Sequence, residues 1–387
     1  MVTGGGSGGH ITPILAVAAE IKKRDPKNTI IYIGQKSDDL VKFINSDDNI
    51  NQSFSIFAGK FRRYHGEGLF QLLDIKTVLK NCRDFIYFII GIIQSYFIIQ
   101  KVKPDILFSR GGYVSVPVAL AARLKKVPYI THDSDSTPSL ANKLISKKAK
   151  FNAVALDAKI YPYIQSKTIV TGIPVSSNFS RVDFNLKQKY LKELNLNSDN
   201  KVLLIIGGGL GAVNINLIFL KIVKELLEQE PKLVIIHLVG GNNETVMSVK
   251  YDDTSILSVK LRSRVRVFGF IKDVYKYSGV ADVIVSRAGA TNIAEFAIQG
   301  KACIIIPSPS LANGHQLKNA NYLSDHQAAI VLQENELKSD PHLLFNSIIK
   351  LLHDDKLKEK LISNILKEAQ PDATKKLVNL ILQDKHV

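Results

Sequence analysis

Residues 286–295 read Ser-Arg-Ala-Gly-Ala-Thr-Asn-Ile-Ala-Glu and follow an apolar run, residues 280–286, that is typical of a buried strand. Unpaired N–H groups at a helix start favour an anion, and small residues let a ligand approach the backbone. Thr291 and Asn292 add side-chain donors, and Glu295 lies one turn later, where its carboxylate could accept hydrogen bonds from a vicinal diol. The pattern predicts a cradle for a nucleoside diphosphate. The alternative is a helix start capped for stability alone.

Two glycine-rich loops strengthen the phosphate interpretation. Residues 4–9 contain the spacing of a dinucleotide-binding fingerprint, and residues 207–212 contain its Gly/Ala variant. Either loop alone suggests NAD or FAD, but after the first loop no acidic residue lies where that fingerprint places its ribose carboxylate. His10 directly follows the first loop, and an imidazole at a helix start suits proton transfer near neutral pH. The alternative for a lone histidine is a structural role.

A second group of polar residues follows two further strand-like runs. Residues 109–117 read Ser-Arg-Gly-Gly-Tyr-Val-Ser-Val-Pro, and residues 131–142 begin Thr-His-Asp-Ser-Asp. Parallel sheets bind ligands outside the carboxyl ends of their strands, so both segments are expected at a site. His132, Asp133 and Asp135 could form a metal site in principle, but their tight spacing without a second His or Cys cluster argues against one.

The apolar runs predict an α/β protein with parallel strands buried on both faces. The predicted strands are Thr29–Gly34, Ile106–Ser109, Tyr129–His132, Phe151–Ala155, Lys201–Ile206, Leu233–Val239, Val265–Phe268, Asp282–Ser286 and Ala302–Ile306. Because a second glycine loop restarts the pattern, we expect two doubly wound domains with a seam at residues 170–175. Residues 357–382 are predicted to form a helix that packs back across both domains.

Composition limits the class of protein. The chain has 387 residues, 45% of them hydrophobic and 22% charged, which indicates a globular protein of more than one domain. Cys82 and Cys303 are its only cysteines and lie far apart, so neither a disulfide framework nor a cysteine metal site is expected. Residues 1–4 do not resemble a signal peptide, and we expect a cytoplasmic protein.

The formal net charge of +16 suits a nucleic acid or an anionic lipid surface. Residues 85–99 are exceptionally apolar, which favours lipid, and no nucleic-acid recognition motif is present. The basic residues that flank this run are Lys60, Arg62, Arg63, Lys76, Lys80, Arg83, Lys101 and Lys103. The run is shorter than the roughly 20 residues that span a bilayer, so it predicts an interfacial helix, with a buried core helix as the alternative.

As a set, these motifs resemble the MurG family of peptidoglycan N-acetylglucosaminyltransferases over nearly the full chain. The matching segments, in the family's order, are residues 4–10 with Pro13, 111–115, the His132 loop, 171–175, 207–212, 269–271, 286–295 and 314–316. The resemblance implies a GT-B fold, in which two doubly wound Rossmann-like domains are separated by a cleft. The implied division is an acceptor and membrane domain over 1–170, a UDP-sugar domain over 171–356, and a C-terminal helix over 357–387.

The resemblance also implies a reaction and partners. GlcNAc would move from UDP-GlcNAc to the 4-hydroxyl of the muramyl sugar of lipid I, which is undecaprenyl-pyrophosphoryl-muramyl peptide, with inversion to give lipid II. No metal or other cofactor is implied. The expected location is peripheral, on an anionic membrane surface at the cytoplasmic face, with no nucleic-acid partner.

Residue roles follow by position. His10 matches the expected base, with Asp133 and Asp135 next in line. The implied substrate-binding residues are Ser7, Gly8, Gly9, Tyr113, Asp135, Ser176, Gly209, Ile271, Ala290, Thr291, Asn292, Glu295, His315 and Gln316.

The chain departs from the family's pattern at several of these positions. Asp133-Ser134-Asp135 replaces Glu-Gln-Asn, Gly209-Leu210 replaces Ser-Gln, and Ile173 and Ser176 replace Asn and Arg. These differences leave open a related glycolipid glycosyltransferase with another UDP-sugar or acceptor. Two other classes also stay open. A UDP-GlcNAc 2-epimerase would not need the apolar segment 85–99, and a nucleotide- or RNA-binding protein would not need a diol-binding Glu295.

Overall fold

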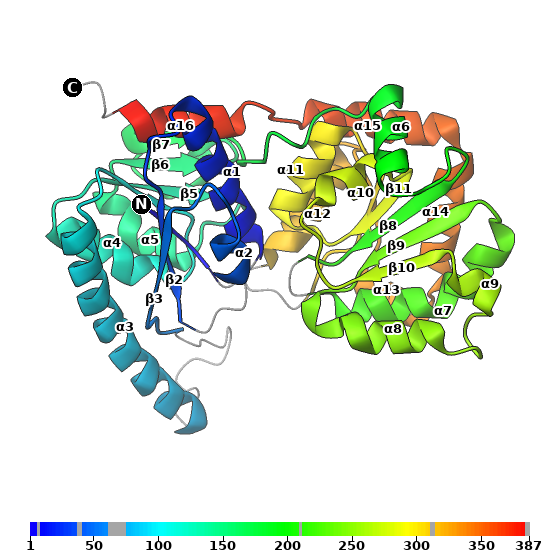
Figure 1. Ribbon diagram of the computed structural model, residues 1–387, viewed down its shortest axis with the longest axis horizontal. Helices are drawn as coiled ribbons and strands as arrows, with labels where there is room; N and C mark the ends of the chain where they lie inside the picture. The colour runs from blue at the N-terminus through cyan, green and yellow to red at the C-terminus, as the bar shows by residue number, and fades with distance from the viewer. Residues whose placement is uncertain (6–7, 37–40, 61–74, 209–210, 310–313, 384–387) are drawn as a thin grey trace. The chain divides into compact units, whose positions relative to one another are not determined.

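The chain folds as two compact units, shown in the computed structural model of Figure 1. The structure describes residues 1–5, 8–36, 41–60, 75–208, 211–309 and 314–383. The N-terminal unit comprises Met1–Ser176 together with Asp372–Val387, and the C-terminal unit comprises Ser177–Pro371. Each unit is built on one parallel sheet, as the apolar runs predict.

The sheet of the N-terminal unit has the order β3-β2-β1-β4-β5-β6-β7 within the described residues. Its strands are β1 Val2–Thr3, β2 Ile31–Gln35, β3 Gln52–Ile56, β4 Leu107–Ser109, β5 Tyr129–Asp133, β6 Phe151–Val154 and β7 Thr168–Val170. Its helices are α1 Gly8–Arg24, α2 Val41–Asn45, α3 Ile75–Val102, α4 Ser115–Leu124, α5 Leu140–Ile145 and α16 Ala373–Leu382. Strands β2, β4, β5 and β6 confirm the predicted runs, whereas β1, β3 and β7 were not predicted.

Helices cover both faces of this sheet. Tyr32 and Ile33 are adjacent on β2 and both fully buried, yet they belong to separate apolar clusters on opposite faces. The first cluster joins the strands to α1 and α16, and the second joins them to α3, α4 and α5. Burial on both faces explains why the strand sequences are continuous apolar runs.

The C-terminal unit repeats the architecture with the order β10-β9-β8-β11-β12-β13. Its strands are β8 Lys201–Ile206, β9 Leu233–Leu238, β10 Val265–Phe268, β11 Val283–Ser286, β12 Cys303–Ile305 and β13 Ile330–Val331. Its helices are α6 Phe184–Glu193, α7 Val213–Gln229, α8 Glu244–Asp252, α9 Val259–Arg262, α10 Val274–Val280, α11 Ala290–Gln299, α12 His315–Asp325, α13 Glu334–Ser339, α14 His342–His353 and α15 Asp355–Lys367. All the predicted strands of this half are present, and only β13 was missed.

The C-terminal stretch differs from the single helix that was predicted. Helix α15 ends at Lys367 and α16 begins at Ala373, with Pro371 between them. Helix α15 contributes Leu361 to the core of the C-terminal unit, whereas α16 buries Leu377 completely in the core of the N-terminal unit. The chain therefore returns to its first unit only with its last helix.

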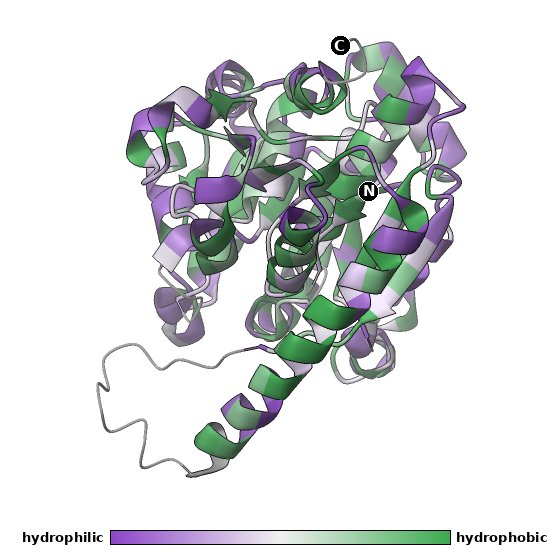
Figure 2. Cartoon of the chain, turned by 90° about the vertical axis from the view of Figure 1, so that its left-hand side faces the viewer, coloured by the Kyte–Doolittle hydropathy of each residue, from purple (hydrophilic) through white to green (hydrophobic). Residues whose placement is uncertain are grey.

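Helix α3 is longer than the predicted apolar run and has an unusual distribution of polarity. Its residues 77–102 are long and apolar enough to cross a membrane by length and composition, and 17% of the most apolar window is buried. Hydrophobic residues lie along most of its length (Figure 2). Its buried positions are Thr77, Asp84, Gly91, Ser95 and Ile99, whereas the side chains exposed by more than two fifths include Leu79, Phe85, Ile86, Ile93 and Phe97. The helix thus turns small and polar residues inward and large apolar residues outward.

Candidate functional site

The predicted residues cluster at the carboxyl ends of strands beside the point where the strand order reverses in each sheet. In the N-terminal unit this point lies between β1 and β4, and in the C-terminal unit it lies between β8 and β11. Each point is flanked by two of the glycine turns found in the sequence. Both units therefore present backbone N–H groups where doubly wound folds bind phosphates.

His10 lies in the first turn of α1, half-buried, with its ring held by the preceding loop. Its Nδ1 is 2.8 Å from the Gly5 carbonyl oxygen. Because a carbonyl only accepts, Nδ1 carries the proton, and in the neutral ring Nε2 is the acceptor. That tautomer has its basic nitrogen directed away from Gly5, as a general base requires.

The loop after β4 closely approaches His10. Gly111 and Gly112 have φ values of 88° and 82°, the left-handed region that favours glycine. A Cβ on Gly112 would lie 3.0 Å from the Gly5 carbonyl oxygen and 3.3 Å from His10 Nδ1. Only glycine fits both the backbone angle and this space, so the structure brings the two predicted loops together.

The other predicted residues of these loops are distributed as follows. Gly8 and Gly9 form the start of α1, and Ser7 lies outside the described residues. The Tyr113 hydroxyl bonds to the side chain of Gln35 at the end of β2. Ser176, predicted as a substrate contact, is half-buried at the last position of the N-terminal unit's first segment.

His132 and Asp133, at the end of β5, are buried and hydrogen-bonded inside the protein, although His132 Nδ1 has no partner among the described residues. His132 is completely buried, and desolvation lowers its pKa to about 3, so the ring is neutral and Nε2 donates to the Gly172 carbonyl at 2.8 Å. Asp133 accepts from the Tyr163 hydroxyl at 2.5 Å and from the Ser139 N–H at 3.1 Å. Burial raises the pKa of Asp133. These bonds favour a role in holding the loop.

Asp135 lies two residues further along, in the same loop. It is half-buried, and its carbonyl accepts from the Tyr161 hydroxyl at 3.0 Å. No group of His, Cys, Asp and Glu suited to a metal occurs among the described residues.

In the C-terminal unit, helix α11 begins as the sequence predicts. Gly289 is its N-cap, makes no side-chain cap hydrogen bond, and has open space where a side chain would lie. The first-turn N–H groups of Ala290, Thr291 and Asn292 have no intrahelical acceptor. Open space beside uncapped N–H groups is the geometry of an anion site.

Glu295 follows one turn later on α11 and is buried, with 7% of its surface exposed. Burial alone raises its pKa to about 8. A buried carboxyl without a stabilising cation or hydrogen bond is costly, and such groups often mark functional sites. Among the described residues, no side chain or N–H group donates a hydrogen bond to the Glu295 carboxylate.

The start of α12 lies against the same loop. The Asn319 side-chain amide donates to the Ala288 carbonyl at 3.1 Å, which ties α12 to the turn before α11. His315 opens α12 after Gly314, whose φ is 59°, and buried Gln316 accepts from the Ser308 N–H at 2.9 Å. The sequence motif named His315 and Gln316, but Asn319 was missed because its partner is 31 residues away.

Two further predicted contacts follow β10 and β8 in the sequence, and these strands are separated in the sheet by β9. Ile271 is buried just after β10, and Gly209 lies outside the described residues. After β8, Gly207 lies close to Ala212, since a Cβ on Gly207 would lie 2.5 Å from the Ala212 Cβ. Helix α7 then begins without a side-chain cap, so its first N–H groups resemble those of α11.

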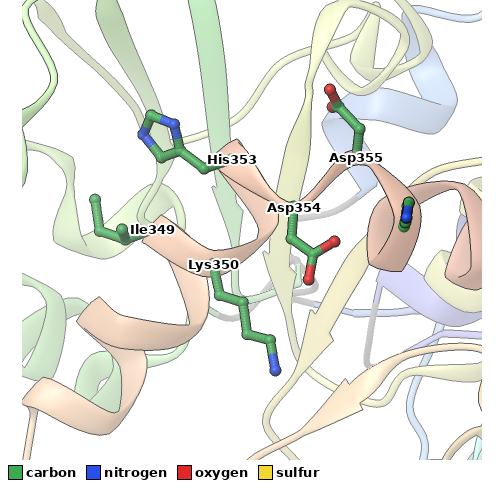
Figure 3. Close-up of a pocket in the computed structure, with 6 residues that line it drawn as sticks. Ile349, Lys350, His353, Asp354 and Asp355 are labelled. Atoms are coloured by element: carbon green, nitrogen blue, oxygen red, sulfur yellow. The ribbon is translucent and has the colours of Figure 1, made fainter.

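A hollow of about 540 Å³ lies elsewhere in this unit, where α14 passes into α15 (Figure 3). Its lining includes Lys350, His353 and Asp355, and an adjoining pocket reaches Lys201 at the amino end of β8. It therefore lies at the opposite edge of the sheet from α11. Its charged groups pair with one another, as in the 2.7 Å contact between Lys358 and Asp355, so it is not the predicted site.

Two Rossmann-like units, each with a glycine turn and a helix start at its switch point, form a GT-B fold, and the matching family models identify the chain as a glycosyltransferase. The N-terminal domain of glycosyltransferase family 28 matches residues 1–154, and the C-terminal domain of that family matches residues 202–377.

Relatives and solved structures agree with this class. The UDP-N-acetylglucosamine--N-acetylmuramyl-(pentapeptide) pyrophosphoryl-undecaprenol N-acetylglucosamine transferase of Natranaerobius thermophilus is 34% identical over 92% of each chain. The enzyme of the same name from Flavobacterium psychrophilum is 32% identical, covering 99% of this chain and 96% of its own. MurG of Acinetobacter baumannii has the same fold, with a TM-score of 0.66 at 24% identity, covering 99% of this chain and 98% of its own. The chain belongs to the MurG family, as its motifs predicted.

Proposed function

We propose that the protein transfers GlcNAc from UDP-GlcNAc to the 4-hydroxyl of the muramyl sugar of lipid I, with inversion, and so forms lipid II. The chain belongs to the MurG family, and relatives that are named as this N-acetylglucosamine transferase align with it over almost their whole length. This membership supports the proposed reaction. The observation that carries the proposal is the buried Glu295, one turn after the uncapped start of α11.

The C-terminal unit would bind the donor. The N–H groups of Ala290, Thr291 and Asn292 would contact the pyrophosphate, and Glu295 would accept from the ribose hydroxyls. The same helix start would stabilise the charge that develops on UDP as the glycosidic bond breaks. His315 and Gln316, on the adjoining helix start, would contact the donor sugar, and Ile271 would lie near the uracil.

The N-terminal unit would supply the base. His10 Nε2 would take the proton from the acceptor 4-hydroxyl as that oxygen attacks the anomeric carbon. The hydrogen bond from Nδ1 to Gly5 supports this role, because it favours the tautomer that the reaction needs. Gly8, Gly9 and Tyr113, beside His10, would face the acceptor pyrophosphate, with Asp135 and Ser176 as further contacts.

The exposed face of α3 supports a peripheral location on the cytoplasmic face of an anionic membrane, where the undecaprenyl chain of the acceptor would lie. Ile86, Ile93 and Phe97 are each more than half exposed, and Lys80, Arg83 and Lys101 lie exposed on the same helix. An apolar helix face with cationic neighbours is suited to the boundary between lipid headgroups and acyl chains.

An epimerase reaction is less well supported. The UDP-N-acetylglucosamine 2-epimerase of Listeria monocytogenes has a TM-score of 0.66 with 11% identity, a likeness of fold alone. The exposed apolar face of α3 would have no purpose in an enzyme that acts on the soluble nucleotide sugar.

Transfer of radiolabelled sugar to a short-chain lipid I analogue tests the proposal, with UDP-GlcNAc, UDP-glucose and UDP-galactose compared in the presence of EDTA. We expect EDTA-insensitive transfer from UDP-GlcNAc, because the helix start rather than a metal neutralises the leaving group. Selective transfer from another sugar would replace the proposed donor. Interconversion of UDP-GlcNAc with its 2-epimer, without transfer, would refute the proposed reaction.

A further inference from the structure

We propose that Arg110 is a positioning residue for the reaction. Its buried guanidinium fixes the position of the backbone beside His10 relative to the loop after β5. The inference rests on the proposed role of His10. Neither the motifs nor the family match assigns a function to Arg110, which directly follows β4 and has only 4% of its surface exposed.

The guanidinium joins two separate segments of the N-terminal unit. Its Nη2 lies 3.4 Å from the Gly9 carbonyl at the start of α1 and also bonds to the Ser134 hydroxyl. Its Nη1 lies 3.4 Å from the His132 carbonyl. A planar group with several donors can satisfy partners in both segments at once.

The sequence of α1 removes the usual intrahelical donor of the Gly9 carbonyl. In an α-helix this oxygen would accept from the N–H of the residue four positions later, which is Pro13, and proline has no N–H. Arg110 Nη2 donates to this carbonyl instead. The peptide unit that it holds is the one joining Gly9 to His10, while the Gly5 carbonyl holds the ring of His10 from the other side. The backbone and the imidazole of the proposed base are thus anchored separately.

Charge also couples Arg110 to the loop after β5. Burial lowers the pKa of Arg110 to about 10, while Asp135 and Asp133 oppose that shift, so the guanidinium remains protonated at neutral pH. Asp133 is in turn held by Tyr163 and Ser139. Displacing this buried, protonated guanidinium is costly, because its charge would lose the attraction of Asp135 and Asp133.

A double-mutant cycle with His10 distinguishes positioning from general stability. Arg110→Lys keeps the charge, but its single nitrogen cannot replace the two-pronged contact with Gly9 and His132. In the lipid I transfer assay we expect kcat to fall about tenfold or more, because small displacements of a catalytic group are costly. The KM for UDP-GlcNAc should not change. In a His10→Ala background the same substitution should cause little further loss, since the two residues would act as a unit.

Arg123→Lys, at an exposed position near the end of α4, is the matched control and should leave all constants unchanged. If Arg110→Lys fails to fold, Ser134→Ala removes one partner and should show the same dependence on His10. Equal fractional losses with and without His10, or a rise in the donor KM, would overturn the positioning role.

Amide hydrogen exchange at residues 8–12 gives a test that does not depend on the reaction. We expect faster exchange there in Arg110→Lys than in the wild type or Arg123→Lys, because the Gly9 carbonyl loses its donor. Unchanged exchange would refute the proposal even if transfer is observed. A wild-type protein without transferase activity would refute the proposed function, while the exchange result would still decide the role of Arg110.

Discussion

At the scale of single residues, Glu295 carries the clearest pH dependence. Its pKa of about 8 means that the carboxyl is largely protonated at neutral pH in the free protein. A diol donates to the ionised form, so UDP-GlcNAc binding should release a proton below pH 8. We expect the Kd for UDP-GlcNAc to fall as pH rises to about 8 and then to level off. Calorimetry in buffers of different ionisation enthalpy measures both effects.

Glu295→Gln is the matched variant, since it keeps the shape and removes the charge. It should raise the Kd for UDP-GlcNAc about 10- to 100-fold at high pH, the expected loss of charged hydrogen bonds, and abolish the proton release. Because the folded-state pKa lies above the ordinary carboxyl value, Glu295 lowers wild-type stability as pH rises from about 4.5 to about 8. The variant should therefore be the more stable protein in alkaline solution without ligand. Unchanged binding would remove Glu295 from the donor site.

Residue types at strand ends could be identified from the sequence, but their partners could not. Glu295, Thr291 and His10 were found because a short segment contains both the helix start and the functional group. The partners of Asp133 were not, since Tyr163 lies 30 residues away and reaches it only through the fold. For this reason the sequence left Asp133 and His10 as competing bases, whereas the structure distinguishes a carboxyl bonded to Tyr163 and Ser139 from an imidazole whose Nδ1 bonds to the Gly5 carbonyl.

At the scale of elements, some strands could be predicted from the sequence and others could not. The central strands were found as apolar runs because helices cover both of their faces. Of the four missed strands, β3, β7 and β13 are at sheet edges, whereas β1 is a central strand that was missed because it has only two residues. Strand β3, Gln52–Ile56, contains polar, partly exposed residues, and β13 has only two residues. An edge strand needs less apolar sequence, so its pattern resembles that of a loop.

Helix α3 gives a prediction at this scale. Replacing Ile86 and Ile93 by Glu should weaken binding to vesicles of phosphatidylglycerol about 100-fold or more, because burying each isoleucine contributes about 1.5–3 kcal/mol. Activity on a water-soluble acceptor should persist, since neither residue is among the proposed substrate contacts. Sedimentation with vesicles measures the first effect, and the transfer assay measures the second.

The matched control for α3 is the pair Val246→Glu and Val249→Glu on α8, where both side chains are also more than half exposed. These changes should not affect vesicle binding. An equal loss in both double variants would show that general charge, rather than the apolar face of α3, determines association with the vesicles.

At the scale of the whole molecule, the N-terminal unit is completed by the last helix of the chain. Thr374 Oγ1 donates to the Val175 carbonyl at 2.7 Å and accepts from the Val175 N–H at 2.9 Å, so the beginning of α16 is joined to the segment that leaves the first sheet. Leu377 and Val378 then pack on α1 within the first core. The two halves therefore cannot be separated at a single point in the sequence without exposing this core.

Paired core substitutions test this organisation. Leu377→Ala and Leu361→Ala remove buried side chains from different units, and each should cost about 2–5 kcal/mol. If each unit unfolds as its own cooperative body, Leu377→Ala should lower the thermal transition of the N-terminal unit, and Leu361→Ala that of the C-terminal unit. UDP-GlcNAc should raise only the second transition, because a ligand stabilises the body that binds it. Calorimetry with and without the nucleotide sugar distinguishes the two transitions. If UDP-GlcNAc instead raised the transition that Leu377→Ala lowers, the donor would bind to the N-terminal unit. The proposed assignment of donor binding to the C-terminal unit would then be wrong.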